Sequence, residues 1–409
     1  MHTFFSADFF TNNRQRLRDL VGSDVPIVVT GNGVMQRGAD EPSPFHQDSN
    51  FWYLTGINAA DLVLVMLAGE TYLIVPSLSA SREAFDGAHN LAAYQERSGI
   101  TVFVGEREGW TRLRRQTDVA TLGTLPPYVR AHGLHTLPYR RRAIARLKRF
   151  SPGVRLHDIR SDLSTLRAVK QPQELQALQA AIDITGQTLR DITGSVLVEA
   201  THEYEIDAAL GYGFRMRGAA GHAFAPIVGA GKHSTTLHYM DNNGPITPDN
   251  LIVLDVGAEV EHYAADVTRT VSQQALTGRE AAVFEAVEAI QDYALSLLQP
   301  GTLLRDYEQA VEAETGRQLQ ALGLIKQATH EHIRRYFPHA TSHFLGLDTH
   351  DVGDYQKPLE PGMVLTCEPG IYIPEEGIGV RIEDDILITP KGHRNLSAAC
   401  PRRLTPVST

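Results

Sequence analysis

The chain has 409 residues and a formal net charge of -10, with 42% hydrophobic and 21% charged residues. This composition is typical of a folded globular protein of two or three domains. The acidic balance argues against nucleic acid as a partner, because phosphate binding needs clustered Lys and Arg. The sequence contains no apolar run of about 18 residues and no signal-peptide pattern, so we expect a cytoplasmic protein with no membrane segment. With only two cysteines, Cys367 and Cys400, a disulfide framework or a thiolate metal cluster is excluded.

The first 165 residues alternate short runs rich in β-branched residues with helical runs, which is typical of an α/β domain. Residues 25–31, 61–77 and 100–106 predict strands, and residues 143–151 predict a helix. The basic residues of the run 140–149 recur at helical spacing, so we interpret them as the solvated face of this helix rather than as a binding patch.

The pattern changes near residue 165, where long amphipathic helices begin, and we expect the domain boundary there. Between residues 172 and 194, apolar side chains recur at intervals that place them on one helical stripe; they are Leu175, Leu178, Ile182, Leu189 and Ile192. Further elements follow, with helices expected over 203–217, 278–298 and 304–323 and two similar β-hairpins over 251–272 and 362–390.

Four acidic residues lie inside the apolar runs of the two hairpins, where an unpaired carboxylate is costly and is usually paired, hydrogen-bonded or bound to a cation. They are Asp255, Asp266, Glu368 and Glu383. Each hairpin can bring two of them onto neighbouring strands. Four carboxylates with one histidine suit a pair of divalent ions such as manganese, cobalt or zinc, which would hold a bridging water and make it hydroxide-like near neutral pH. The sequence therefore predicts a hydrolytic metal centre.

Three histidines, His339, His343 and His350, lie close together in a segment of small and apolar residues. A histidine that binds a metal is neutral and has its second nitrogen held by another group, whereas a proton-transferring histidine needs a pKa near the working pH. The spacing leaves three interpretations open for each: a metal ligand, an acid/base group or a packed core histidine.

The segments around these residues resemble the successive metal-site motifs of the pita-bread metallopeptidases, the superfamily of methionine aminopeptidase, aminopeptidase P and prolidase. The segments are LDVGAEVEHYAADVTRT, HATSHFLGLDTHDVG, EPGMVLTCEPGIYI and GVRIEDDILIT. Residues 45–66, FHQDSNFWYLTGINAADLVLVM, resemble the N-terminal domain of the Xaa-Pro aminopeptidases. The resemblance implies an α/β N-terminal domain over residues 1–165 and an α+β pita-bread catalytic domain over residues 166–409, with a curved, mostly antiparallel sheet.

Position by position, the resemblance implies two divalent metal ions, with manganese expected and cobalt or zinc as alternatives. Asp255 would chelate one ion, and Asp266 and Glu383 would bridge both. His343 and Glu368 would complete the coordination of the other ion, and Glu368 would also take the proton from the bridging water.

The resemblance also implies roles for residues around the substrate. His350 would contact the substrate carbonyl or its oxyanion, and His238 would help proton traffic to the leaving nitrogen. His339 would line the proline site. Arg381 and Tyr372 would also contact the substrate region.

Two strand positions follow from alternation. In an extended strand Arg381 shares a face with Glu383, so it would orient this carboxylate or steer a substrate carboxylate. Cys367 points away from its neighbour Glu368, and we interpret it as a small buried hydrophobe.

The resemblance implies an Xaa-Pro aminopeptidase, which uses a metal-bridging hydroxide to release the N-terminal residue of peptides with proline at the second position. A homodimer or homotetramer is expected. Two alternatives remain: an Xaa-Pro dipeptidase (prolidase), and a non-catalytic peptide- or protein-binding member of the fold. The complete ligand set favours an enzyme, because non-catalytic members have usually lost metal ligands.

Overall fold

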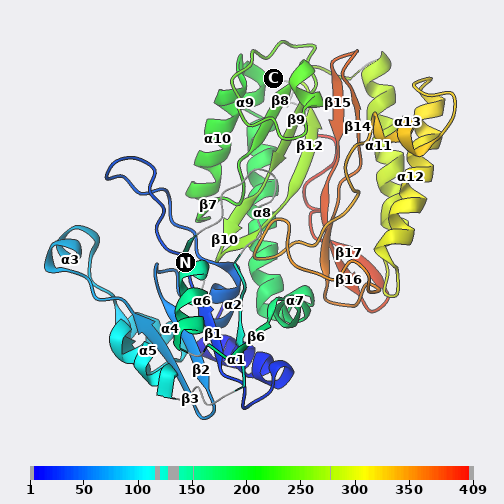
Figure 1. The fold of residues 1–409 in the computed structure, drawn as a ribbon. Coiled ribbons are helices and arrows are strands. Elements are labelled where there is room, and N and C mark those ends of the chain that lie inside the picture. The colour runs from blue at the N-terminus through cyan, green and yellow to red at the C-terminus, as the bar shows by residue number, and fades with distance from the viewer. Residues whose placement is uncertain (1–3, 116–119, 128–137, 151, 277, 405–409) are drawn as a thin grey trace. The chain divides into compact units, whose positions relative to one another are not determined.

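The computed structural model describes residues 4–115, 120–127, 138–150, 152–276 and 278–404 (Figure 1). The chain divides into two compact units, His2–Leu166 and Arg167–Thr409. Helix α7 (Arg160–Ala168) spans the junction between the two units. Within the described residues, no helix is both long and apolar enough to cross a membrane.

The N-terminal unit is built on one mixed six-stranded sheet in the order β4-β3-β2-β1-β5-β6. Strand β2 pairs antiparallel with β1 and β3, whereas β4, β5 and β6 are in parallel pairs. The strands confirm the three predicted strand regions, and their bounds are β1 (Ile27–Thr30), β2 (Val63–Leu67), β3 (Glu70–Val75), β4 (Val102–Gly105), β5 (Thr121–Thr124) and β6 (Arg155–Asp158). The helices of this unit are α1 (Ala7–Val21), α2 (Ser49–Thr55), α3 (Ala80–Asp86), α4 (Leu91–Ser98), α5 (Glu106–Arg115) and α6 (Pro138–Phe150).

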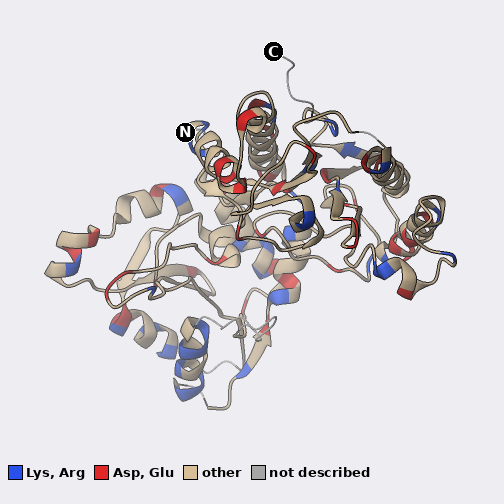
Figure 2. Cartoon of the chain, turned by 90° about the horizontal axis from the view of Figure 1, so that it is seen from above, with Lys and Arg blue, Asp and Glu red and all other residues tan. Residues whose placement is uncertain are grey.

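One part of the predicted basic helix face is not solvated. The Arg140 side chain on α6 is only 6% exposed and forms an ion pair with the buried carboxylate of Asp48. Asp48 also caps the N-terminus of α2 by accepting a hydrogen bond from the Phe51 amide. The prediction was wrong at Arg140 because a buried partner 92 positions away cannot be seen in helical spacing. Along other helices acidic and basic residues are interspersed, as Figure 2 shows.

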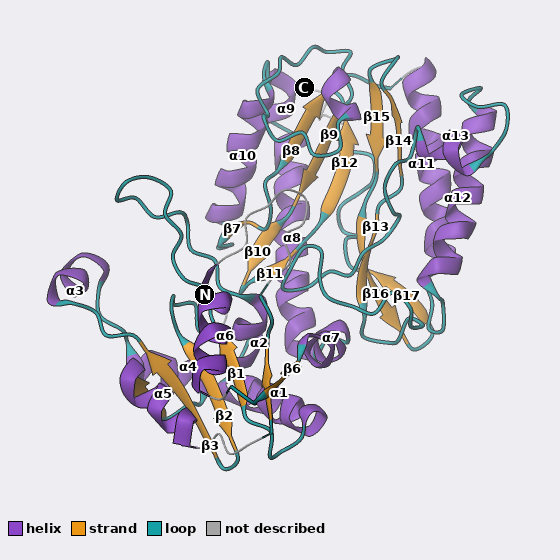
Figure 3. Ribbon diagram, viewed as in Figure 1, coloured by secondary structure: helices purple, strands orange, loops and turns teal. Residues whose placement is uncertain are grey.

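The second unit carries two helical layers around its strands (Figure 3). Helix α8 (Pro172–Thr193) packs on the strands of the first hairpin, and α10 (Glu203–Met216) packs on α8 and on the neighbouring strands β7 (Gly221–His222) and β8 (Ile227–Ala230). Helix α11 (Gly278–Leu297) packs on the strands of the second hairpin, and α12 (Leu304–Ala321) packs on α11. These helices confirm the four predicted ones. Three short helices are also present: α9 (Val196–Glu199), the 3-10 helix η1 (Gly231–Thr235) and α13 (His330–Arg334).

The start of helix α8 is determined by residues that are neighbours in the sequence. It begins with a proline in its first turn and a capping box formed by Gln171 and Glu174. Of the five apolar residues in its predicted stripe, Leu178, Ile182, Leu189 and Ile192 are buried, while Leu175 is half-buried.

The two predicted hairpins form, and each is broken in the middle into two pairs of strands. In the first, β9 (Ile252–Val256) pairs with β12 (Val267–Val271) and β10 (Ala258–Val260) pairs with β11 (Tyr263–Ala264). In the second, β13 (Val364–Cys367) pairs with β16 (Asp384–Thr389) and β14 (Gly370–Ile373) pairs with β15 (Ile378–Arg381). All of these pairs are antiparallel. Strands β7 (Gly221–His222), β8 (Ile227–Ala230) and β17 (Gly392–Asn395) extend the sheets.

A glycine marks the break in the first hairpin. Gly257 lies between β9 and β10, and a Cβ atom there would be 1.8 Å from the Ala265 carbonyl oxygen. Only glycine allows the two backbones to approach this closely. Asp266 follows Ala265, so this break sets the place of a predicted site residue.

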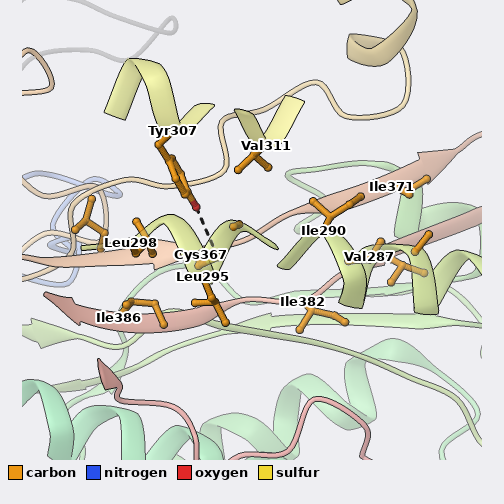
Figure 4. Close-up of a cluster of buried hydrophobic side chains, with 14 of the residues drawn as sticks. Val287, Ile290, Leu295, Leu298, Tyr307, Val311, Cys367, Ile371, Ile382 and Ile386 are labelled. Atoms are coloured by element: carbon orange, nitrogen blue, oxygen red, sulfur yellow. Dashed lines mark hydrogen bonds between the residues drawn. The ribbon is translucent and has the colours of Figure 1, made fainter. Parts of the chain in front are cut away.

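The main core of the second unit lies between its second hairpin and helices α11 and α12 (Figure 4). Cys367 is fully buried there, and the Tyr307 hydroxyl lies 3.7 Å from its sulfur. Burial raises the pKa of the Cys367 thiol, so the side chain stays neutral. The structure thus supports the interpretation of Cys367 as a small buried hydrophobe.

Candidate active site

The four predicted carboxylates lie at or beside the breaks in the two hairpins. Asp255 is on β9, opposite Thr268 of β12. Asp266 comes just before β12, Glu368 just after β13, and Glu383 between β15 and β16. All four were predicted to lie inside strands, and the prediction was wrong for these last three, which lie just outside regular strands.

The backbone at these breaks bonds outside its own hairpin ladder. The Glu383 amide donates to the Thr268 carbonyl at 3.1 Å, which joins the second hairpin to the first. The Glu368 amide donates to the Thr341 carbonyl at 2.9 Å, which brings in the histidine segment. The Asp266 amide donates to the Asp385 carboxylate at 3.2 Å. At each break, the carboxylate residue thus bonds through its amide to a segment outside its own hairpin.

The breaks bring the predicted ligands together. One ligand atom each from Asp266, His343 and Glu383 lie within 4.8 Å of one another. His343 Nε2 is 3.5 Å from Asp266 Oδ2 and 3.4 Å from Glu368 Oε1. Asp255 is close enough for its charge to raise the pKa of Asp266. All five residues thus form one cluster.

The carboxylates of this cluster destabilise one another's charge. Burial first, and then the neighbouring carboxylates, raise the pKa values of Asp266 and Glu383 well above their ordinary range. Burial also raises the pKa of Glu368 to about 7. Buried like charges that repel in this way are stabilised by a bound cation.

The histidine of the cluster is oriented by its second nitrogen. His343 Nδ1 lies 3.0 Å from the Phe344 carbonyl oxygen, to which it donates. This bond places a proton on Nδ1 and leaves Nε2, which faces Asp266 and Glu368, as the nitrogen that can bind a metal.

A chain of hydrogen bonds leads from Asp255 away from the cluster. Arg381 donates from Nη2 to Asp255 Oδ2 at 2.5 Å and from Nη1 to the Tyr372 hydroxyl at 2.8 Å. The Tyr372 hydroxyl is 2.8 Å from His339 Nε2, and His339 Nδ1 is 2.8 Å from the Ala340 carbonyl oxygen. Burial lowers the pKa of His339 to about 3, so Nδ1 donates, Nε2 accepts and the imidazole is neutral. Arg381 thus holds the Asp255 carboxylate by a direct hydrogen bond, and Tyr372 and His339 in turn hold Arg381 from the other side.

The two remaining predicted histidines lie at the edge of the cluster. The rings of His350 and His343 are 4.3 Å apart between centroids, at an angle of 68°. Burial, then His343 and His238, lower the pKa of His350. His238 also lowers the pKa of His339, so it lies near both residues although its own side chain is exposed. The structure thus places all ten predicted site residues in one region of the second unit.

Three residues at the site were missed by sequence reasoning. Thr268 donates from its hydroxyl to Glu383 Oε2 at 2.6 Å and accepts from Arg381 Nε at 3.1 Å. Its position two after Asp266 was an available signal, since alternate strand residues share a face. Asp385, two after Glu383, accepts from the Asp266 amide. Glu308 on α12 accepts two bonds from the Thr341 amide and gave no signal in the sequence.

The donor set fits a pair of divalent cations. It comprises four carboxylates and one imidazole, which suit first-row divalent ions. One observation supports the fit independently: the Oδ1 atom of Asp255 is buried and has no hydrogen-bond partner among the described residues. A buried carboxylate oxygen without a partner is costly, and a cation would satisfy it.

Comparison with known proteins agrees with this geometry. Residues 176–390 match metallopeptidase family M24, and residues 10–106 match the aminopeptidase P N-terminal domain. The chain belongs to metallopeptidase family M24. The metallopeptidase is 32% identical over 422 residues to human Xaa-Pro aminopeptidase 3, which covers 94% of this chain and 80% of the relative. It is 29% identical to the Escherichia coli Xaa-Pro aminopeptidase, covering 97% of this chain and 96% of that one.

Solved structures confirm the predicted fold class of this metallopeptidase. The E. coli aminopeptidase P structure matches with a TM-score of 0.87 at 28% identity, covering 97% of this chain and 96% of that one. A Pseudomonas aeruginosa aminopeptidase matches with a TM-score of 0.88 at 26% identity and the same coverage. The protein therefore has an α/β N-terminal domain and a pita-bread catalytic domain with antiparallel sheets.

The contacts of Arg381 predict that lysine cannot replace it in this metallopeptidase. Lysine cannot donate in three directions from a planar group, so Asp255, Tyr372 and Thr268 cannot all keep their bonds in Arg381→Lys. We expect peptidase activity to fall by about 10- to 100-fold, the effect usual for residues that orient metal ligands. Steady-state kinetics beside Arg335→Lys, an exposed control, would check this. Equal activity of the two variants would show that the three hydrogen bonds donated by the Arg381 guanidinium are not needed for activity.

Proposed function

We propose that the protein is a dinuclear metal-dependent Xaa-Pro aminopeptidase. The observation that carries the proposal is the cluster of Asp266, His343 and Glu383 beside Glu368 and Asp255. Similarity to Xaa-Pro aminopeptidases along almost the whole chain supports it. Two ions, manganese first and cobalt or zinc as alternatives, would be held by these five residues. One matched structure is a zinc-substituted E. coli aminopeptidase P in complex with product.

The reaction is hydrolysis of the bond before proline. When bound, the ions would supply an activated water and positive charge beside the scissile carbonyl. Glu368 takes a proton from the water as the water oxygen attacks the carbonyl carbon. His350, kept neutral by its lowered pKa, donates a hydrogen bond to the carbonyl oxygen as that oxygen becomes negative. His238 helps to pass the proton that Glu368 took from the water on to the proline nitrogen as the C–N bond breaks.

The neighbouring residues suit a proline ring. An Xaa-Pro bond has no amide N–H and a fixed φ, so it cannot be bound as an extended hydrogen-bonded strand and needs a shaped apolar site. His339 has both ring nitrogens engaged and is neutral, so its ring offers an uncharged wall, with Tyr372 beside it at 5.6 Å between centroids. One matched structure is E. coli aminopeptidase P with the inhibitor Pro-Leu.

The setting of the enzyme is part of the proposal. Its partners are peptides with proline at the second position, and not nucleic acid or membranes. It works in the cytoplasm as a homodimer or homotetramer; the two free, buried cysteines suit a reducing compartment. Residues 1–165 and 166–409 are its two domains, a division supported by the compact units that meet at residues 166 and 167.

A peptide series tests the proposal. Protein loaded with manganese should release alanine from Ala-Pro-Ala and Ala-Pro-Ala-Ala faster than from the dipeptide Ala-Pro, and should leave Ala-Ala-Ala uncut. A preference for Ala-Pro would show the alternative activity, an Xaa-Pro dipeptidase. No release from any peptide would favour a non-catalytic member of the fold.

A further inference from the structure

A buried carboxylate outside the metal cluster organises the loop that carries His238. Glu203, in the first turn of α10, has 0% exposure. Its Oε1 accepts hydrogen bonds from the Ala230 amide at 2.8 Å and from His233 Nδ1 at 2.9 Å. Its Oε2 accepts from the Tyr239 hydroxyl at 2.7 Å and from the Gly244 amide at 2.6 Å. One side chain thus holds four points of the segment 230–244.

The contacts around Glu203 leave little freedom. The Glu203 amide donates to the Gly244 carbonyl at 3.0 Å, so backbone and side chain hold the same residue. A Cβ on Gly244 would lie 2.5 Å from the His233 ring and 2.9 Å from the Glu203 carboxylate. The rings of His233 and Tyr239 stack at 4.3 Å with an angle of 23°. The end of the segment at Gly244 therefore closes tightly on these side chains.

The chemistry explains why this arrangement is strongly specified. A buried carboxylate is costly unless its oxygens are hydrogen-bonded, and here all four donors come from the one segment. Between η1 and β9 this segment has no regular helix or strand among the described residues, so side-chain bonds, together with the bond from the Glu203 amide to the Gly244 carbonyl, define its path. A path that moved these donors away would leave the buried Glu203 carboxylate without these hydrogen bonds.

His238 precedes Tyr239, the residue tied to Glu203 at the middle of the segment. Its side chain is exposed. The segment runs beside the active-site strand β15, because η1 packs on β15 and a Cβ on Gly379 of that strand would lie 2.1 Å from the Ser234 carbonyl oxygen. We propose that Glu203, through the Tyr239 hydroxyl, is a positioning residue that holds His238 towards the active site. This inference rests on the proposed function only for the role of His238 in catalysis.

The first test uses Tyr239→Phe, which removes the hydroxyl and keeps the ring stacked on His233. A hydrogen bond to a charged group contributes enough that losing it should speed amide hydrogen exchange in the peptide covering residues 236–244 by roughly 10-fold or more. Exchange elsewhere, metal content and melting temperature should stay close to those of the parent. Tyr212→Phe, an exposed tyrosine on α10, is the matched control. Unchanged amide hydrogen exchange over residues 236–244 would overturn the claim that the Tyr239–Glu203 hydrogen bond, here called the tether, holds this segment in place.

The second test is a double-mutant cycle on kcat with Ala-Pro-Ala. Tyr239→Phe should lower kcat about 10-fold through misplacement of His238, with KM nearly unchanged. It should cause no further loss in protein that already carries His238→Ala, because the residue it positions is gone. Losses that multiply in the double variant would overturn positioning through His238. A parent protein that cuts no peptide would refute the proposed function, and the exchange result would then decide the tether alone.

Discussion

Replacing Asp266 with alanine is expected to abolish peptidase activity, by about 10³-fold or more, and to lower the content of bound divalent metal. Asp266 lies at the centre of the cluster, with His343 Nε2 at 3.5 Å and Glu383 in the same group of ligand atoms. Because Asp266 is proposed to bridge both ions, one substitution weakens the binding of both. The two ions together supply several kcal/mol of charge stabilisation to the transition state. Glu383→Ala should have the same effect for the same reason. Metal analysis of the purified protein beside kcat/KM on Ala-Pro-Ala measures both losses.

Asp292→Ala is the matched control for this prediction. Asp292 is 67% exposed and pairs with Arg402 at the surface, so its loss should change neither metal content nor activity. If Asp266→Ala kept both metals and more than a tenth of the activity, the bridging assignment would be wrong.

His350→Ala is expected to lower kcat by about 10²-fold while the protein keeps its metal. The ring of His350 lies 4.3 Å from that of the ligand His343, but His350 is outside the group of ligand atoms formed by Asp266, His343 and Glu383. Removing one hydrogen-bond donor from a developing oxyanion typically costs about 10²- to 10³-fold. The measurement is kcat on Ala-Pro-Ala together with metal content, compared with His332→Ala, an exposed histidine on α13.

Metal content separates the possible roles of His350. Loss of both metals in His350→Ala would make it a ligand or a support for ligands. Unchanged kcat would remove it from the reaction altogether.

Local patterns predicted the fold well where neighbouring residues determine it. Helix α8 follows its apolar period and its capping residues, and the two hairpins follow alternation and turns. Patterns failed at the breaks in the hairpins. Asp266, Glu368 and Glu383 lie outside the ladders because their amides bond to distant partners, such as Thr268 for Glu383 at a separation of 115 positions.

The sequence predicted which residue types bind the metal at the site. It did not predict the residues that orient those ligands. Carboxylates inside apolar runs stand out because burying them is costly. The residues that orient them do not stand out, since a threonine in a strand or a glutamate at the start of a helix is ordinary in sequence. Thr268 beside Glu383 and Glu203 beside Tyr239 become visible only when the chain is folded.

Metal reconstitution followed by peptide cleavage tests the central claim most directly. Metal-free protein would be titrated with manganese, and release of alanine from Ala-Pro-Ala and from Ala-Ala-Ala would be measured at each step. The account predicts no cleavage without metal, activity that rises until two ions are bound per chain, and cleavage of the proline peptide alone. Full activity in the metal-free protein, or no cleavage of Ala-Pro-Ala with two ions bound, would contradict it.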